Sequence, residues 1–361
     1  MNHNHLILRN ILKTQTEMLQ LSRSHYEDDI LPLLQSMRVD LWKKVEQIKL
    51  TGVTNKQRTD RLNVMLQQSD ELIENYYLKI HKRSRKMQFE SAKMTNSLFA
   101  MRFNRDLGNE LFKTLNQRQL SAITKKTLYG SNTLKRTSGV WWEQQSELLK
   151  KKYREAVQVS IAEQEPIYKI VQKIRGSRAN KFTDGIMKAS YVQAKMIARS
   201  SIIHVSNSTR MELYQENQDI ISGFKWVSTL DGRTTLLCAM LDGKVWDLEY
   251  NPIDHDFDYP GETPHFGCRS TQIPVMKPYK DMPLEKQKII DEKGMRSSYQ
   301  GYVPKDTKYS TFLRNESTEF QNQVLGQQRA TLFRQGKLSL DDMISKDFEK
   351  IKLAELEKKI D

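Results

Sequence analysis

The side chains best suited to metal or nucleophilic chemistry gather in one short segment of this chain. Its only two cysteines, Cys238 and Cys268, stand there with His265, three residues before the second cysteine. Thiolate sulfur and imidazole nitrogen are ligands that zinc prefers in proteins. We therefore interpret Cys238, His265 and Cys268 as candidate zinc ligands.

This set is one ligand short, because a closed structural zinc site uses about four Cys or His side chains. A fourth ligand could come from the loop between the cysteines, which carries Asp254, His255, Asp256 and Asp258. Two other interpretations stay open. The cysteines could be small buried apolar residues beside a hydrogen-bonded packing histidine. They could also form a disulfide, since the sequence does not fix the redox compartment.

The flanking sequence predicts a small β-rich element that would bring these side chains together. A β-prone run at 224–227 is followed by Asp-Gly pairs at 231–232 and 242–243, which are typical of turns. The segment 251–264 contains three prolines among aspartates, which favours an ordered surface loop. Such a loop can return the chain so that the second cysteine approaches the first.

Around the cysteines the chain carries Asp-Gly-Arg-Thr, Leu-Asp-Gly-Lys and Pro-His-Phe-Gly-Cys-Arg. This pattern resembles the phage Mu F-like (MuF) head morphogenesis family, found in minor capsid proteins of tailed phages. The matching residues are Thr229, Asp231, Arg233, Thr234, Cys238, Leu241, Asp242, Gly243, Lys244, Pro264, His265, Cys268 and Arg269.

The resemblance covers about residues 155–345 and includes two departures. Many relatives carry further cysteines where this chain has Thr235 and Ser270. Relatives also tend to have an Ala-Arg-Thr-Glu step in the preceding helix, where this chain reads Ala-Arg-Ser-Ser at 198–201. The tail resembles a segment that follows many MuF domains, on the positions Val324, Leu325, Gly326, Arg329, Gly336 and Lys337.

A cysteine and histidine pair can also act as nucleophile and base, with Asp231 or Asp242 orienting the histidine. Turn formation is a sufficient explanation of both Asp-Gly pairs. The chain has no Gly-rich phosphate loop, no His-Glu-x-x-His and no Gly-x-Ser-x-Gly motif. We therefore predict that the protein is not an enzyme and has no cofactor beyond a possible zinc ion.

The positive charge of the chain predicts a polyanionic neighbour. Its 361 residues carry a formal net charge of +14, with an isoelectric point near 9.5. Any single basic cluster is well explained as a solvated helix face, but the unbalanced total favours nonspecific contact with DNA phosphates. No motif for reading bases is present. The candidate DNA contacts are Lys79, Lys82, Arg83, Arg85 and Lys86.

Apolar residues at helical spacing predict amphipathic helices over 31–48 and 62–80, with a break between them near 51–60. Further helices are predicted at 142–162, from Pro166 to Gly176, and at 184–215. The run Val140-Trp141-Trp142 is expected in the core.

The residues after 275 predict a different organisation. Prolines interrupt 280–310, which indicates a linker with one short helix at 284–292. Two short helices divided by Gly326 and ended by Gly336 should follow, and then a helix from Leu340 with Ser339 as its N-cap.

Together these patterns predict an α+β fold, with an elongated, mostly helical N-terminal half, a small α+β MuF-like domain and a helical C-terminal tail. The expected bounds are 1–154 for a helical assembly region, 155–275 for the MuF-like head morphogenesis domain and 276–361 for the linker and tail. No run of about 18 apolar residues is present, so no membrane-spanning segment is expected. The N-terminus lacks the features of a secretory signal.

The resemblance implies a minor capsid protein that binds the portal protein or the inner capsid and contacts packaged double-stranded DNA during head assembly and DNA delivery. It implies a location in the virion, inside the capsid near the portal, after a stay in the host cytoplasm. The alternative is a MuF-associated toxin or enzyme, a nuclease or transferase, carried by a phage. Because a domain of about 120 residues normally buries an adequate core, we expect removal of residues 1–105 to leave a folded domain.

Overall fold

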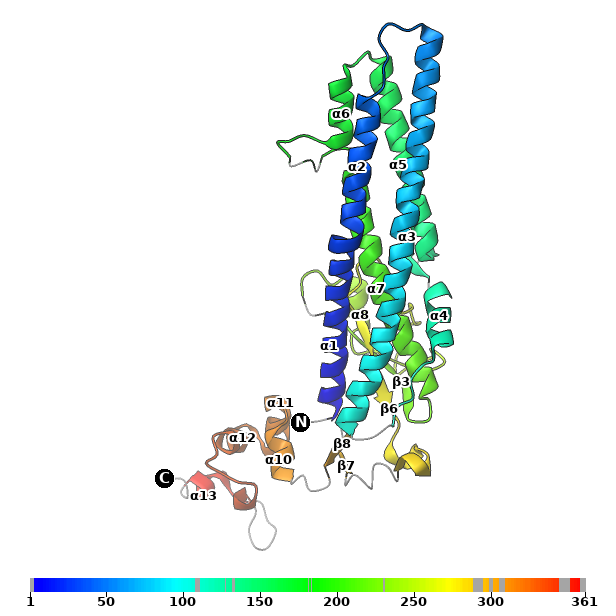
Figure 1. Ribbon diagram of the computed structural model, residues 1–361. Coiled ribbons are helices and arrows are strands. Elements are labelled where there is room, and N and C mark those ends of the chain that lie inside the picture. Colours follow the sequence, from blue (N-terminus) through cyan, green and yellow to red (C-terminus); the bar gives the residue numbers. More distant parts are fainter. Residues whose placement is uncertain are drawn as a thin grey trace. The chain divides into compact units, whose positions relative to one another are not determined.

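A computed structural model describes residues 3–107, 111–126, 128–131, 134–180, 182, 184–229, 231–287, 295–298, 301–304, 309–343 and 351–357 (Figure 1). The chain divides into two compact units. The large unit contains Leu12–Ala100 and Lys113–Val275, and the small unit contains Met1–Ile11, Met101–Phe112 and Met276–Asp361.

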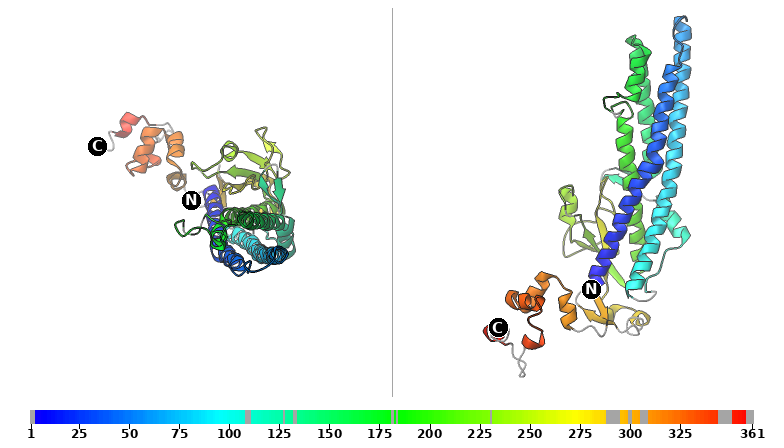
Figure 2. Two further views of the ribbon diagram at one scale, coloured as in Figure 1. Left: turned by 90° about the horizontal axis from the view of Figure 1, so that it is seen from above. Right: turned by 60° about the vertical axis from the view of Figure 1, so that its left-hand side comes forward.

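Long helices lying side by side make up most of the large unit (Figures 1 and 2). Helix α7 is central, because it contacts α2, α4, α5, β1 and β3. A π-helical segment, η1, joins α1 to α2 without a break. The helices are α1 (His3–Ser24), η1 (His25–Ile30), α2 (Leu31–Glu46), α3 (Asn55–Leu107), α4 (Gln117–Lys126), α5 (Ser138–Ala162), α6 (Ile167–Arg175) and α7 (Lys188–Glu216).

Local sequence signals explain where these helices begin and end. Helix α6 starts directly after Pro166, whose fixed φ suits the first turn, and it ends at Gly176. Gly176 has φ +86°, and a Cβ there would stand 2.7 Å from Asp184 Oδ1, so only glycine fits. The predicted break between the first helices and the predicted helices at 142–162 and 184–215 are confirmed. The sequence did not predict α4 or the hairpin of β1 (Tyr129–Ser131) and β2 (Leu134–Arg136).

One hydrophobic core runs through the helices of the large unit. It joins residues from α2 and α3 to residues from α5, α6 and α7. The side chains of Leu34, Met37 and Leu41 on α2 are fully buried in it. Trp142 and Trp141 are also buried, with 1% and 9% of their surface exposed, as expected for the core. Helices α2 and α3 therefore share one hydrophobic core with α5, α6 and α7.

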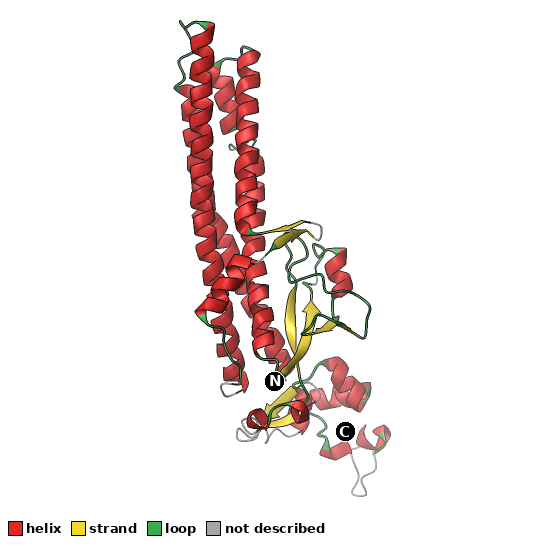
Figure 3. Cartoon of the chain, turned by 90° about the vertical axis from the view of Figure 1, so that its right-hand side faces the viewer, coloured by secondary structure: helices red, strands yellow, loops and turns green. Residues whose placement is uncertain are grey.

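A four-stranded sheet with the order β5-β4-β3-β6 completes the large unit (Figure 3). Strand β3 pairs antiparallel with β4, with Phe224 opposite Trp246, and both rings are fully buried. A short helix, α8 (Leu236–Leu241), stands between β3 and β4 in the sequence. The strands are β3 (Ile221–Val227), β4 (Val245–Asp247), β5 (Pro252–Ile253) and β6 (Thr271–Met276). The mostly helical α+β fold is confirmed.

The small unit has its own core beneath short helices, formed by Leu313, Leu325, Ala330, Phe333, Leu338, Met343 and Leu356. Its helices divide at Gly326, as predicted, and Ser339 accepts a hydrogen bond from the Asp342 N–H group as a cap does. The helix predicted from Leu340 is a 3-10 turn, η3 (Asp341–Met343), as far as the described stretch continues after Ser339. The other elements are η2 (Tyr279–Asp281), β7 (Met295–Ser298), β8 (Gly301–Pro304), α10 (Tyr309–Arg314), α11 (Thr318–Leu325), α12 (Gln327–Arg334) and α13 (Leu353–Glu357).

The linker prediction for 280–310 is wrong in one respect, because β7 and β8 pair there as an antiparallel hairpin. Period-two alternation is too weak over four-residue strands to reveal such a hairpin. The end of the helix predicted at 284–292 lies outside the described residues. No helix in the described part of the chain is both long enough and apolar enough to cross a membrane.

Candidate metal centre and basic groove

Cys238, His265 and Cys268 meet in the large unit. One ligand atom from each lies within 4.8 Å of the others. The two Sγ atoms are 3.7 Å apart, and Nε2 of His265 is 3.2 Å from Sγ of Cys238. Both cysteines are buried, with 2% and 1% of their surface exposed, whereas the histidine is partly exposed. The arrangement is a sulfur and nitrogen cluster with one side toward solvent.

Helix α8 and the strand before it hold Cys238 in place. Thr235 caps the helix, because its hydroxyl accepts a hydrogen bond from the Cys238 N–H group at 3.4 Å. The Ser228 hydroxyl donates to the Cys238 carbonyl at 2.6 Å. The same Thr235 hydroxyl lies 3.1 Å from Nε2 of His265. Thr235, whose hydroxyl is a weak metal ligand, therefore contacts both Cys238 and His265.

Contacts within the cluster shift the pKa values of all three side chains. The hydrogen bond from Cys268 lowers the pKa of the Cys238 thiol to about 4, and the same contact raises the pKa of Cys268. The two thiols therefore share one proton. The hydrogen bond to Cys238 also raises the pKa of His265. A buried thiol of lowered pKa next to an imidazole nitrogen supplies two of the donor types that zinc prefers.

Helix α7 fixes the segment that carries His265 and Cys268. The Ser200 hydroxyl accepts from the Gly267 N–H group at 2.9 Å, and Asn207 Nδ2 donates to the Glu262 carbonyl at 2.9 Å. Arg210, only 1% exposed, donates to Thr271 Oγ1 at 2.6 Å. These helix residues lie on one face, and sequence reasoning missed them. Their spacing of seven and three residues within an apolar helix was the available signal.

Asp231 forms a stronger ion pair than the sequence suggested. The predicted local pair with Arg233 is present at 3.3 Å. Arg269 also binds both carboxylate oxygens, at 2.6 and 2.5 Å, across 38 residues of sequence. The Arg269 hydrogen bond lowers the pKa of Asp231 strongly. Because this carboxylate is committed to arginines, it does not orient His265, whose Nδ1 instead lies 3.0 Å from the Phe266 carbonyl.

The other motif residues have structural contacts in and around the sheet. Asp242 accepts a hydrogen bond from the Ser228 N–H group at 2.7 Å, so it also does not orient the histidine. Gly243 has φ +79°, which the turn into β4 requires. Thr234 donates to the Thr229 carbonyl. Leu241 and Pro264 are buried, and the Lys244 ammonium lies 5.5 Å from the centre of the Phe257 ring.

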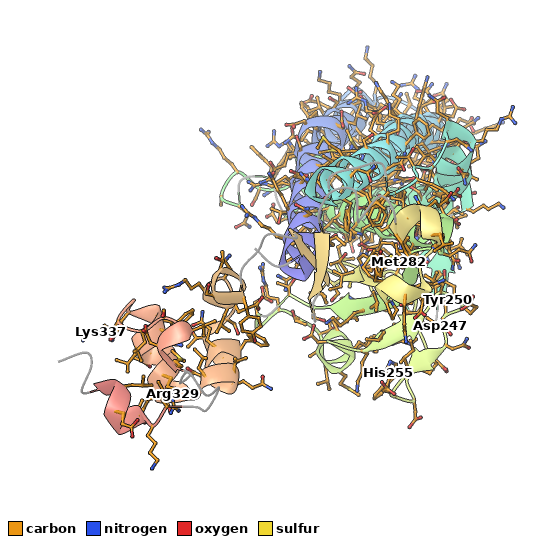
Figure 4. The ribbon with its side chains drawn as sticks, turned by 90° about the horizontal axis from the view of Figure 1, so that it is seen from below. Asp247, Tyr250, His255, Met282, Arg329 and Lys337 are labelled. Atoms are coloured by element: carbon orange, nitrogen blue, oxygen red, sulfur yellow. The ribbon has the colours of Figure 1, made fainter. Side chains whose placement is uncertain are left out.

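His255 does not supply a fourth ligand. Its Nε2 lies 2.8 Å from the Val245 carbonyl, and its Nδ1 accepts from the Phe257 N–H group at 3.2 Å. Figure 4 labels His255 near Asp247 and Tyr250, on the part of the sheet around β4 and β5. Among the described residues, no carboxylate joins the Cys238, His265 and Cys268 cluster, so the suggestion of an aspartate ligand from 254–258 is wrong. The loop is instead held by contacts with β4 and α7, through His255 and Glu262.

A second candidate site is a groove of about 460 Å³ between α3 and α4, called here the basic groove. Three of the five candidate DNA contacts line it: Lys82, Arg85 and Lys86. The other two point elsewhere, since Lys79 lies over the Tyr76 ring and Arg83 donates to the Asp29 carbonyl. The remaining lining residues are Leu78, His81, Gln88, Phe89, Ser121, Thr124 and Lys125.

No carboxylate appears among these lining residues. Within the described part of the chain, Lys82, Arg85, Lys86 and Lys125 form no ion pair. Burial and the neighbouring Arg85 lower the pKa of His81. Lys125 comes from a different basic cluster of the sequence, so the fold gathers into one groove cations that lie about forty residues apart.

Residues 144–273 match the family described as Phage Mu protein F like protein. This match confirms the resemblance of the motif residues. It begins within α5 and ends within β6, so it includes α6, α7 and the cysteine and histidine cluster. Comparison with curated proteins and with solved structures gave no match.

Proposed function

We propose that this protein, whose residues 144–273 form a Phage Mu F-like segment, is a minor capsid (head morphogenesis) protein of a tailed bacteriophage. The family match is the observation that carries the proposal. The expected location is the virion, inside the capsid near the portal, with host cytoplasm as the place of synthesis and assembly. The protein acts as a structural component, since Asp231 and Asp242 are bound to other groups and leave the cysteine and histidine pair without an orienting carboxylate.

The proposed protein partners are the portal and the inner capsid wall. We assign docking to the helices of residues 1–154, the proposed assembly region. Helices α3 and α5 of this region present apolar side chains to solvent. Val64, Leu78 and Leu148 are each more than half exposed, at 54%, 58% and 52%.

The proposed nucleic-acid partner is double-stranded DNA, bound through the basic groove without regard to sequence. Unpaired ammonium and guanidinium groups attract phosphates and release counterions from DNA. The hydroxyls of Ser121 and Thr124, which also line the groove, can donate to phosphate oxygens. The lining offers no element shaped to enter the major groove and read base edges. Contact with the sugar-phosphate backbone is therefore the form of recognition that this groove supports.

The head-protein proposal predicts that purified virions contain the protein. Mass spectrometry of particles should detect a few copies per virion, and a nonsense mutation in its gene should lower the yield of infectious particles. A phage carrying the restored reading frame is the control. Absence from purified virions, together with release of the protein from lysed cells, would favour the toxin or enzyme alternative and contradict the proposal.

A further inference from the structure

We propose that Cys238, His265 and Cys268 bind one zinc ion that links helix α8 to the loop before β6. The inference rests on side-chain geometry and is independent of the head-protein proposal. Two thiolate sulfurs about 2.3 Å from a tetrahedral zinc ion are separated by about 3.8 Å. The Sγ atoms of Cys238 and Cys268 are 3.7 Å apart. The two sulfurs are therefore already spaced as two corners of a zinc coordination tetrahedron require.

The histidine is also oriented as a ligand. Its Nδ1 lies 3.0 Å from the Phe266 carbonyl, so Nδ1–H donates there and Nε2 keeps its lone pair. Such a hydrogen bond from the second ring nitrogen is the usual support of zinc-bound histidine. Nε2 points to Cys238 Sγ at 3.2 Å, and zinc binding needs about 3.6 Å for this edge. A small outward shift of the partly exposed ring supplies the difference.

The surrounding structure holds the ligands before any metal arrives. The Ser200 hydroxyl binds the Gly267 N–H group between the two downstream ligands, at 2.9 Å. Asn207 binds the Glu262 and Ser270 carbonyls on either side of them, at 2.9 and 3.4 Å. The site is therefore preorganised by α7, which reduces the entropy that metal binding costs.

A disulfide fits this arrangement less well. It requires the sulfurs to approach to about 2.05 Å, whereas they lie 3.7 Å apart. Simple apolar packing does not account for an imidazole nitrogen 3.2 Å from the buried sulfur of Cys238. A cation bound by all three groups accounts for every contact in the cluster.

Thr235 marks the fourth coordination position. Its Oγ1 lies 3.1 Å from Nε2 of His265 and accepts from the Cys238 N–H group. A neutral hydroxyl is a weak zinc ligand, so the fourth ligand is a water molecule beside Thr235. The site then has three strong ligands. It should bind zinc less tightly than a site with four.

This reasoning gives a gain-of-binding test on the full-length, reduced protein. Zinc content is measured by elemental analysis after dialysis, and affinity by competition with a chromophoric chelator. The unsubstituted protein should bind one equivalent, and Co²⁺ should give the sulfur-to-metal absorption of thiolate ligation. Thr235→Cys should tighten binding on the order of tenfold or more, because it adds a fourth strong ligand. Cys268→Ser should abolish stoichiometric binding.

His255→Ala is the matched control, since this histidine is bound to the Val245 carbonyl outside the cluster and should not alter zinc content. If Cys268→Ser fails to fold, the zinc content of the unsubstituted protein and of Thr235→Cys still tests the geometry. A folded protein with correctly placed ligands must bind zinc. Absence of zinc and cobalt binding in the folded, unsubstituted protein would overturn the proposal, whatever Thr235→Cys binds. So would a spontaneous disulfide between Cys238 and Cys268 in protein purified under reducing conditions.

Discussion

Reversing Lys82, Arg85 and Lys86 together to glutamate is expected to weaken binding of duplex DNA on the order of a hundredfold at moderate salt. These side chains line the basic groove, are exposed, and have no ion-pair partner within the described part of the chain. Each phosphate contact contributes through counterion release, so the slope of log affinity against log salt should also fall by about three. Gel-shift titrations at several salt concentrations measure both quantities.

The control is a variant with the same change in net charge on other surfaces. Lys152, Lys169 and Lys188 lie on α5, α6 and α7 and are exposed. Their triple reversal to glutamate should weaken binding much less, and without a comparable loss of slope. Equal effects of the two variants would show that total charge, and not the basic groove, determines affinity. Binding that persisted at high salt or required one sequence would contradict backbone recognition altogether.

Removing residues 1–105 is expected to unfold the large unit, contrary to the expectation from sequence that a folded domain would remain. Helix α2 alone buries Leu34, Met37, Leu41 and Val45 completely or nearly so in the shared core. At about 1.5 to 3 kcal/mol for each buried side chain, these four contribute about 6 to 12 kcal/mol. That sum is comparable to the whole stability of a typical domain, about 5 to 15 kcal/mol.

Circular dichroism and thermal unfolding of the fragment 106–361 would measure this effect, and the isolated fragment 155–275 should behave in the same way. Deletion from Thr311 is the control, because the core of the small unit lies almost entirely within the deleted residues. The large unit should then keep a cooperative transition. A cooperative transition in fragment 155–275 would show that the shared core is dispensable for the MuF-like segment.

The two expectations about residues 1–105 differ for a physical reason. Helical periodicity shows that one face of a helix is apolar, but it does not show which partner covers that face. The sequence pattern places Leu34 and Leu41 in a separate helical region. In the structure they pack in the same core as Ile170 and Ile174 of α6. Any assembly role of the N-terminal helices must therefore be carried by their exposed faces, while their buried faces support the MuF-like segment.

The sequence by itself determined the local features of this protein. Caps and periodicity located α6, α7 and the break before α3, because helix starts and stops depend on a few neighbouring residues. The motif residues around Cys238, His265 and Cys268 predicted the family whose model matches residues 144–273. These signals depend on residues that are close together in the sequence, so the sequence alone is enough to predict them.

The tertiary structure decided every feature that joins distant residues. It placed Lys125 beside Lys86 in one groove, and it turned Lys79 and Arg83 away from that groove. It also brought Asn207 to the loop that carries His265, where its Nδ2 donates to the Glu262 carbonyl from more than fifty residues away. Such pairings follow from how complete helices and strands pack. Spacing along the chain records which faces are apolar or charged, but only packing determines which faces meet.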